Sequence, residues 1–239
     1  SAMRFKSPLL RGRLVKRYKR FLADVVLDDG REITATCPNT GSMMGLSQPG
    51  LAVWLSESAS PTRKYAHTWE LVELGDGTSR SFVGINTSHP NAIVAEAVTE
   101  GLIAPLTGYA SMRREVKYGQ SSRIDLLLED PAKGLAYVEI KNVHLLRETG
   151  LAEFPDSKTE RGVKHLAELT EMVRAGHRAV MIYLIQRGDA ARFRPARDID
   201  PKYADALLAA RTAGVEAYAI TCRLTPEAIT VDRVLPAIE

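Results

Sequence analysis

Apolar and polar residues alternate in short segments over the first third of the chain, and clusters of glycine, proline, aspartate and serine separate these segments. Alternation with a period of two is typical of β-strands that bury one face. Two of the segments flank Asp28, Asp29 and Gly30, a sequence that favours a tight hairpin turn. The strands expected from this pattern cover residues 21–27, 31–37, 51–56, 67–74 and 79–85.

Beyond Ser88 the pattern changes to helical segments and strands in alternation. Ser88 is placed to cap the first helix, and Ser157 with Glu160 has the spacing of a capping box for the second. The expected elements are a helix at 88–101, strands at 112–116, 122–128 and 136–143, a helix at 156–176, a strand at 178–185, a helix at 200–214 and a strand at 215–222. This order predicts a mixed α/β domain.

The change of pattern divides the chain into two expected domains. Several short strands within 85 residues are typical of a small closed barrel such as an OB-fold, with a small β-sandwich as the alternative. OB-folds often bind single-stranded nucleic acid by stacking bases on aromatic side chains. We therefore predict an OB-fold-like nucleic-acid-binding domain at residues 1–85 and an α/β domain with a mixed sheet at residues 86–239.

Two expected strands of the second domain carry charged residues between apolar ones. If they pair about a turn centred on Ala132, Asp125 and Glu139 lie opposite each other, because each is equally far from the centre. Side chains alternate along a strand, so Lys141 shares the face of Glu139. The apolar residues expected to face a core on the other side are Ile124, Leu126, Val138 and Ile140.

This charged face has two interpretations. Opposed carboxylates repel each other, and a hard cation such as Mg2+ or Mn2+ would reverse that interaction. Lys141 would then stabilise charge on a phosphate, which favours phosphodiester hydrolysis. Glu96, on the preceding helix, is a candidate third ligand or an exposed helix residue. The alternative interpretation is a salt-bridged cluster on a solvated sheet, in which Arg123 joins Asp125, Glu139 and Lys141.

Basic residues are concentrated near the N-terminus, with eight Lys and Arg and no acidic residue between positions 4 and 20. With aromatic residues interleaved, this segment favours a nucleic-acid partner, either single- or double-stranded DNA; a solvated strand edge is the alternative. Helix starts also attract phosphates. The candidate DNA contacts are Lys16, Arg17, Lys19, Arg20, Lys158, Arg161 and Arg187. A homodimer is compatible with action on duplexes. The polar turn at 37–45 is interpreted as a phosphate contact or a simple loop.

Other classes of protein are disfavoured. Cys37 and Cys222 are far apart in sequence, as is typical of reduced thiols in the cytoplasm. The histidines lack the spacing of a zinc hydrolase. No apolar run approaches the roughly 20 residues needed to cross a bilayer. We therefore expect a cytoplasmic protein with no membrane partner.

The order of elements, together with Asp125, Glu139 and Lys141, resembles the PD-(D/E)xK nuclease superfamily, with Ile124 and Asp125 in place of its Pro-Asp dipeptide. More closely, the chain resembles the sugar fermentation stimulation protein A family. This resemblance rests on blocks between about residues 37 and 220, among them CPNTGSM, PNAIVAEAV, GYASMRREVKYGQSSRIDLLL, YVEIKNVHL and FPDSKTERGVKHL.

The resemblance implies an OB-like domain joined to a nuclease-like domain, DNA binding, and a regulatory role in sugar metabolism. It also implies Asp125 and Glu139 as metal ligands, Lys141 as the catalytic lysine and Glu96 as a helix acid. Two functions follow from it as hypotheses. One is a Mg2+- or Mn2+-dependent DNA nuclease, and the other is a non-catalytic DNA-binding regulator of sugar metabolism genes that keeps the nuclease scaffold.

Overall fold

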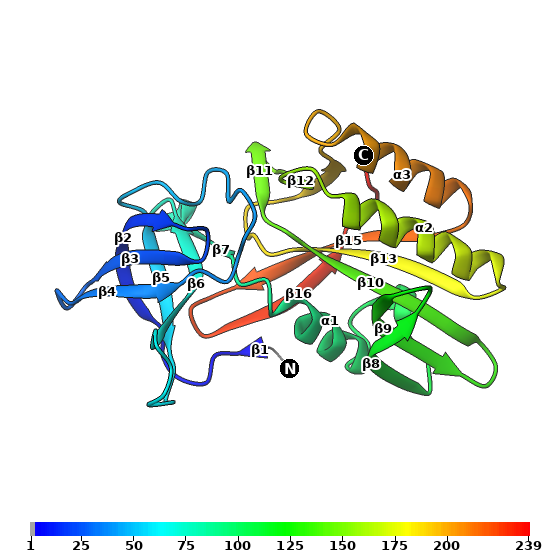
Figure 1. Ribbon diagram of the computed structural model, residues 1–239, viewed down its shortest axis with the longest axis horizontal. Coiled ribbons are helices and arrows are strands. Elements are labelled where there is room, and N and C mark those ends of the chain that lie inside the picture. The colour runs from blue at the N-terminus through cyan, green and yellow to red at the C-terminus, as the bar shows by residue number, and fades with distance from the viewer. Residues whose placement is uncertain (1–2) are drawn as a thin grey trace.

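The computed structural model describes residues 3–239, so Ser1 and Ala2 of the expected first domain lie outside the described residues. Its first sheet has six strands in the order β4-β3-β2-β5-β6-β7, and an additional pairing of β4 with β6 closes β2 to β6 into a barrel (Figure 1). The strands are β2 (Leu10–Tyr18), β3 (Leu22–Leu27), β4 (Glu32–Thr36), β5 (Ala52–Glu57), β6 (His67–Leu74) and β7 (Ser81–Gly84), with a 3-10 helix η1 (Gly77–Ser79) before β7. The OB-like barrel is confirmed, and the alternative sandwich is wrong.

The barrel core is filled by the apolar side chains that the alternating pattern directs inward. Leu14, Leu55 and Trp69 are buried in it. Gly12 lies where β2 approaches β3 most closely, since a Cβ atom there would be 2.7 Å from Val25 Cγ1 and 2.7 Å from the carbonyl oxygen of Val26. Only glycine permits this approach, and the close pairing lets the sheet curve into a barrel.

The second sheet has seven strands in the order β1-β16-β15-β13-β10-β9-β8. β10, β13 and β15 are parallel neighbours, whereas the outer pairs are antiparallel. Figure 1 shows α1 against one face of this sheet and α2 with α3 against the other. The mixed α/β fold is confirmed. No helix within residues 3–239 is long and apolar enough to cross a membrane.

The elements outside the barrel have the following bounds. The helices are α1 (Pro90–Thr99), η2 (Ala104–Leu106, 3-10), α2 (Glu160–Arg174) and α3 (Pro201–Thr212). The strands of the second sheet are β1 (Met3–Arg4), β8 (Ser111–Tyr118), β9 (Ser122–Asp130), β10 (Gly134–Val143), β13 (Arg178–Ile185), β15 (Glu216–Leu224) and β16 (Ala228–Val234). A third, small sheet contains β11 (Leu145–Glu148), β12 (Leu151–Phe154) and β14 (Arg192–Pro195).

The barrel is attached to the second domain by more than one connection. β1 pairs with β16, so the first described residues of the expected domain 1–85 belong to the second sheet and not to the barrel. The backbone N–H of Gly84 donates to the carbonyl oxygen of Gln186 at 2.8 Å. Leu71 of β6 and Phe82 of β7, both from the first sheet, pack in the core on the α1 side of the second sheet. These contacts fix the two domains against each other.

Both predicted helix caps are wrong. The cap position of α1 is His89, and Ser88 instead donates its hydroxyl to Asn86 Oδ1 at 2.6 Å. Thr159 takes the place of Ser157 at the start of α2, because its hydroxyl accepts a hydrogen bond from the third backbone amide of the helix. The predicted capping box is therefore not formed.

The hairpin of β9 and β10 has the predicted register, with Leu126 opposite Val138 and the turn at Ala132. The ladder is interrupted at Asp125. The pairing of β9 with β10 ends at Leu126. In the pairing of β9 with β8, Asp125 and Glu115 are not paired, although the residues on either side of them are. Glu115 has a left-handed φ of 58°. Such local distortions re-aim a side chain away from its regular direction.

The distortion changes how the hairpin packs. Leu126, Val138 and Ile140 contribute to the core on the α1 side, as predicted. Ile124 packs instead among the residues under α2 and α3. The prediction that all four share one face is therefore wrong for Ile124, because regular alternation does not extend through Asp125.

Candidate functional site

The hairpin brings Asp125, Glu139 and Lys141 to one point of the second domain. All three line a cavity of about 400 Å³. Lys141 Nζ lies 3.8 Å from Glu139 Oε1, on the shared face expected from alternation along β10. The sequence-predicted trio is therefore close enough to act on one bound group.

Asp125 is held by two hydrogen bonds at the distorted position of β9. Its Oδ1 accepts from Asn91 Nδ2 at 2.9 Å, and its Oδ2 accepts from the backbone N–H of Ile140 at 2.7 Å. Burial and the neighbouring charge of Glu139 raise the pKa of Asp125 to about 6, although both hydrogen bonds favour the charged form. The two carboxylates repel each other when both are ionised, so a positive charge between them would stabilise the ionised pair.

Glu139 carries a polar atom without a partner. The residue is only 4% exposed, and its Oε1 lies 3.2 Å from His165 Nδ1. Its Oε2 is buried with no hydrogen-bond partner, and an unpaired buried carboxylate oxygen is costly. A hard divalent cation takes such oxygens as ligands, together with water and substrate phosphate. The Asp125 and Glu139 carboxylates therefore fit a cation of this class.

The cation would have few protein ligands. Within residues 3–239 there is no group of three or more His, Cys, Asp and Glu side chains arranged to hold a metal ion. Mg2+ is commonly held by one or two carboxylates and keeps several waters, so two carboxylates suffice for it. The donor set consists of oxygens alone, which favours Mg2+ or Mn2+ over zinc.

Lys141 is buried beside a histidine. Its Nζ lies 3.0 Å from His165 Nδ1, and its side chain is 16% exposed. Burial lowers the pKa of Lys141, and the carboxylates of Glu139 and Asp125 oppose that effect only in part. His165 Nδ1 therefore lies within reach of both the Lys141 ammonium and the Glu139 carboxylate. His165 was not predicted; its place four residues after Arg161 on α2 is the signal that would have indicated it.

Glu96 is not brought to the carboxylate pair. It is half-buried on α1 and lines neither cavity that contains Asp125. Asn91, at the start of the same helix, contacts Asp125 instead. Of the alternative salt-bridged cluster, the Lys141–Glu139 pair is formed. Arg123 does not join it, because its side chain is exposed and donates to the backbone carbonyl of Glu115 at 3.3 Å.

The loop between β4 and β5 forms the barrel side of the cavity. Asn39, Thr40 and Gly41 line it, and Asn39 Nδ2 lies 2.7 Å from His144 Nε2 of the second domain. One terminal nitrogen of Arg17 donates to the carbonyl oxygens of Asn39 and Gly41, each at 2.8 Å. Arg17 therefore holds this loop, and its contact with DNA stays a prediction. The polar turn at 37–45 is a wall of the cavity, which lies at the domain junction.

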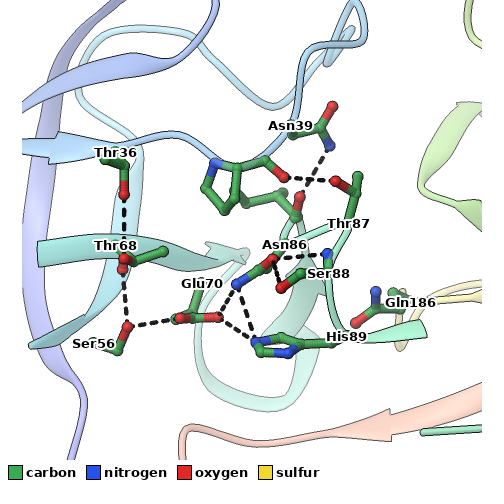
Figure 2. Close-up of polar contacts among 12 residues, drawn as sticks. Thr36, Asn39, Ser56, Thr68, Glu70, Asn86, Thr87, Ser88, His89 and Gln186 are labelled. Carbon is green, nitrogen blue, oxygen red and sulfur yellow. Dashed lines mark hydrogen bonds and ion pairs between the residues drawn. The ribbon is translucent and has the colours of Figure 1, made fainter. Parts of the chain in front are cut away.

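A buried polar network fixes the connection between the domains (Figure 2). Glu70 of β6 accepts from Ser56 Oγ at 2.6 Å and Asn86 Nδ2 at 3.0 Å, and it pairs with His89 Nε2 at 2.8 Å. Burial tends to raise the pKa of Glu70, but the hydrogen bonds from His89 and Ser56 outweigh it and lower the pKa. The segment from Asn86 to His89, which this network holds, leads directly into α1, where the side chain of Asn91 donates to Asp125.

The predicted DNA contacts of the second domain differ in their surroundings. Arg161 lines the cavity from the first turn of α2, and Lys158 is exposed just before that helix. Arg187 is only 5% exposed. Its guanidinium donates to both carboxylate oxygens of Asp189 at 2.8 and 2.9 Å, and to the carbonyl oxygen of His144 at 2.8 Å. The side chain of Arg187 is engaged in these buried contacts, and its predicted contact with DNA stays a prediction.

Three basic residues of the barrel are exposed on β2 and on the turn that follows it. Lys16 is at the end of β2, and Lys19 and Arg20 form the turn to β3 with left-handed φ values of 53° and 65°. Phe21 follows and is 53% exposed. Its carbonyl oxygen accepts from the backbone N–H of Cys37 at 2.7 Å, so this turn lies against the start of the cavity loop.

Two family models match the chain. The SfsA N-terminal OB domain matches residues 15–85, and the sugar fermentation stimulation protein RE domain matches residues 88–228. A sugar fermentation stimulation protein homolog from Rhodospirillum centenum is 60% identical over 98% of this chain and 98% of its own length. A second homolog, from Sinorhizobium medicae, is 56% identical over 99% of this chain and its full length.

A solved structure has the same architecture. SfsA of Pyrococcus furiosus, in complex with Ca2+, is 28% identical and superimposes with a TM-score of 0.87, covering 100% of this chain and 99% of the relative. The family models and homologs together extend over both domains. The chain therefore belongs to the sugar fermentation stimulation protein A (SfsA) family.

Proposed function

We propose that this protein binds DNA and hydrolyses its phosphodiester bonds at Asp125, Glu139 and Lys141, with Mg2+ or Mn2+ as cofactor. The observation that carries the proposal is the buried Oε2 of Glu139, which has no partner and lies beside an aspartate of raised pKa. The relative from Pyrococcus furiosus was solved in complex with Ca2+, which supports a divalent cation in this family.

Each residue of the site has a task in this reaction. Asp125 and Glu139 would hold the cation through their carboxylate oxygens. When bound, the cation polarises the phosphate and lowers the pKa of a water molecule. The ammonium of Lys141 faces the charge that develops on the phosphate oxygens, and His165 fixes its position through Nδ1. Arg161, on the cavity wall, is placed to orient the substrate phosphate.

The hydrolysis is balanced with water alone. The oxygen of one water molecule forms a bond to phosphorus, and one P–O ester bond breaks. The leaving sugar oxygen takes up a proton, and the attacking water releases one. The products are one phosphate end and one hydroxyl end. We propose that Lys16, Lys19, Arg20 and Lys158 bind phosphates of the same DNA, so that binding weakens as salt increases.

A cleavage assay with one matched variant tests the proposal. Single- and double-stranded DNA are incubated with the protein in Mg2+, in Mn2+ and in EDTA. Glu139→Gln keeps the shape of the side chain but removes its charge, so we expect cleavage at least about 100-fold slower, as is typical when a metal site is weakened. Cleavage undiminished in this variant would show a contaminant. Binding without cleavage in either metal would favour the non-catalytic DNA-binding regulator.

A further inference from the structure

The carboxylate pair lies between two cavities. The second, of about 530 Å³, shares Asn91, Asp125, Glu139 and Arg161 with the first. The first cavity is walled by the barrel loop, and the second is walled by the β8–β9 hairpin and α2. Figure 1 shows the barrel and this hairpin at opposite ends of the molecule. The reacting position is therefore open in two directions.

Cations gather on the side away from the barrel. Arg123 and Lys164 line the second cavity, and Lys164 Nζ donates to Ser121 Oγ at 3.2 Å. Lys117 lies directly opposite Arg123 in the antiparallel pair of β8 and β9. Like charges in that arrangement destabilise a sheet. Lys117 is exposed and forms no ion pair with any residue between 3 and 239. A polyanion bound here would attract both cations and so offset the repulsion between them.

Acidic residues do not cancel this charge. Apart from the carboxylate pair, the acidic residue that lines the second cavity is Glu115. The cations that line it are Arg123, Arg161 and Lys164. Glu168, which accepts from the lining Ser122 at 2.5 Å, offsets part of this charge. With the carboxylate pair set aside, the cations still outnumber the acidic groups beyond the reacting position, which suits the backbone of a nucleic acid.

From this geometry we infer that one DNA strand continues through both cavities, from the basic turn of the barrel to the β8–β9 hairpin. The inference rests on the proposed function and adds the mode of cleavage: the bond that breaks is internal, and no free end is needed. Phosphates beyond the reacting position contact Lys117, Arg123 and Lys164. A closed circle of DNA is therefore a substrate, and each cut consumes one water molecule.

The mode of cleavage is tested with closed circles. Single- and double-stranded circles, and the same molecules opened at one site, are incubated with the wild-type protein in Mn2+ and followed by gel electrophoresis. We expect circles and linear molecules to be cut at similar rates. Cleavage of linear DNA with intact circles would overturn the inference and leave the nuclease in place. If neither form is cut, the proposed catalytic function fails as well.

The path of the DNA strand is tested by binding measurements that do not require cleavage. Lys117→Ser with Arg123→Ser removes two cations of the hairpin, and Lys202→Ser with Arg211→Ser removes two exposed cations of α3 as the matched control. In a plot of log binding constant against log salt for single-stranded DNA, we expect the hairpin variant to have a slope shallower by about 1.4, because each phosphate contact contributes about 0.7. The control slope should be unchanged.

A third variant separates the two sides. Lys16→Ser, Lys19→Ser and Arg20→Ser together should make the slope shallower by about 2 through the same release of counterions. If the barrel variant changes the slope and the hairpin variant does not, the proposed DNA binding stands and the path beyond the site is wrong. If only the hairpin variant changes it, the role of the barrel turn is wrong.

Discussion

Replacing Lys141 by methionine is expected to slow DNA cleavage by about 100- to 1,000-fold, the range seen when one donor to a developing negative charge is removed. Methionine has a similar length and no charge, and Lys141 is largely buried, so the fold should be retained. Binding of Mn2+ and of DNA should change little, because the ligands Asp125 and Glu139 remain. The measurement is the single-turnover rate at saturating protein and Mn2+.

The matched control is Lys202→Met, which removes an exposed lysine of α3. Its cleavage rate should equal that of the wild type. A Lys141→Met protein that cleaves at the wild-type rate would exclude Lys141 from the reaction, even if the metal site were correct. Loss of Mn2+ binding in this variant would show that the lysine supports the carboxylates and does not act on the phosphate.

Replacing Asp125 by asparagine is expected to remove a pH-dependent loss of stability from the metal-free protein. The pKa of Asp125 is raised from 3.8 to about 6, so the folded protein holds this proton more tightly than the unfolded chain does. The contribution of Asp125 to the free energy of unfolding therefore falls as pH rises between these two values. At about 1.4 kcal/mol per pKa unit, the loss is about 3 kcal/mol. Asparagine does not titrate, so the variant does not have this pH-dependent loss of stability.

Urea unfolding in EDTA, at several pH values between 4 and 8, checks this expectation. The difference in free energy of unfolding should shift in favour of Asp125→Asn by about 2.4 kcal/mol over that range, because part of the effect is already present at pH 4. A difference that is constant with pH would contradict the raised pKa. Added Mn2+ should then stabilise the wild type more than the variant, because ligand binding to the folded state adds to its stability.

The hairpin of the site could be predicted from sequence because its determinants are local. The alternation in β9 and β10 and the turn at Ala132 set the register that places Asp125 near Glu139. The position of Lys141 follows from the same alternation. The pattern does not predict the interruption of the strand pairing at Asp125. Because of this interruption, the side chain of Ile124 packs on the side of the sheet that α2 and α3 cover.

Helix α1 shows why its contact with Asp125 could not be predicted from sequence. Its apolar residues lie on most of its sides, since Pro90, Ile93, Val94, Ala95 and Ala97 are all buried. A pattern with no single apolar face does not determine how the helix is rotated against the sheet. Packing of the whole domain decides that Asn91 contacts Asp125.

Two arginines show that the contacts of a charged side chain are also hard to predict from sequence. Arg17 was predicted to contact DNA as part of a basic segment, and Arg187 because it follows the end of a strand. In the structure Arg17 holds the carbonyl oxygens of the cavity loop, and Arg187 is paired with Asp189 under the domain junction. The carbonyl oxygens that Arg17 binds, and the His144 carbonyl oxygen that Arg187 binds, come from segments distant in sequence, which residue type and spacing do not specify.

The central claim is that Asp125 and Glu139 hold one divalent cation between them. It is tested most directly by soaking crystals of the protein in Mn2+ and measuring anomalous X-ray scattering at the manganese edge. We expect one anomalous peak in contact with carboxylate oxygens of both Asp125 and Glu139, and we expect the peak to be lost in Asp125→Asn crystals. A saturating soak that gives no peak between the two carboxylates of the wild type would contradict the metal site.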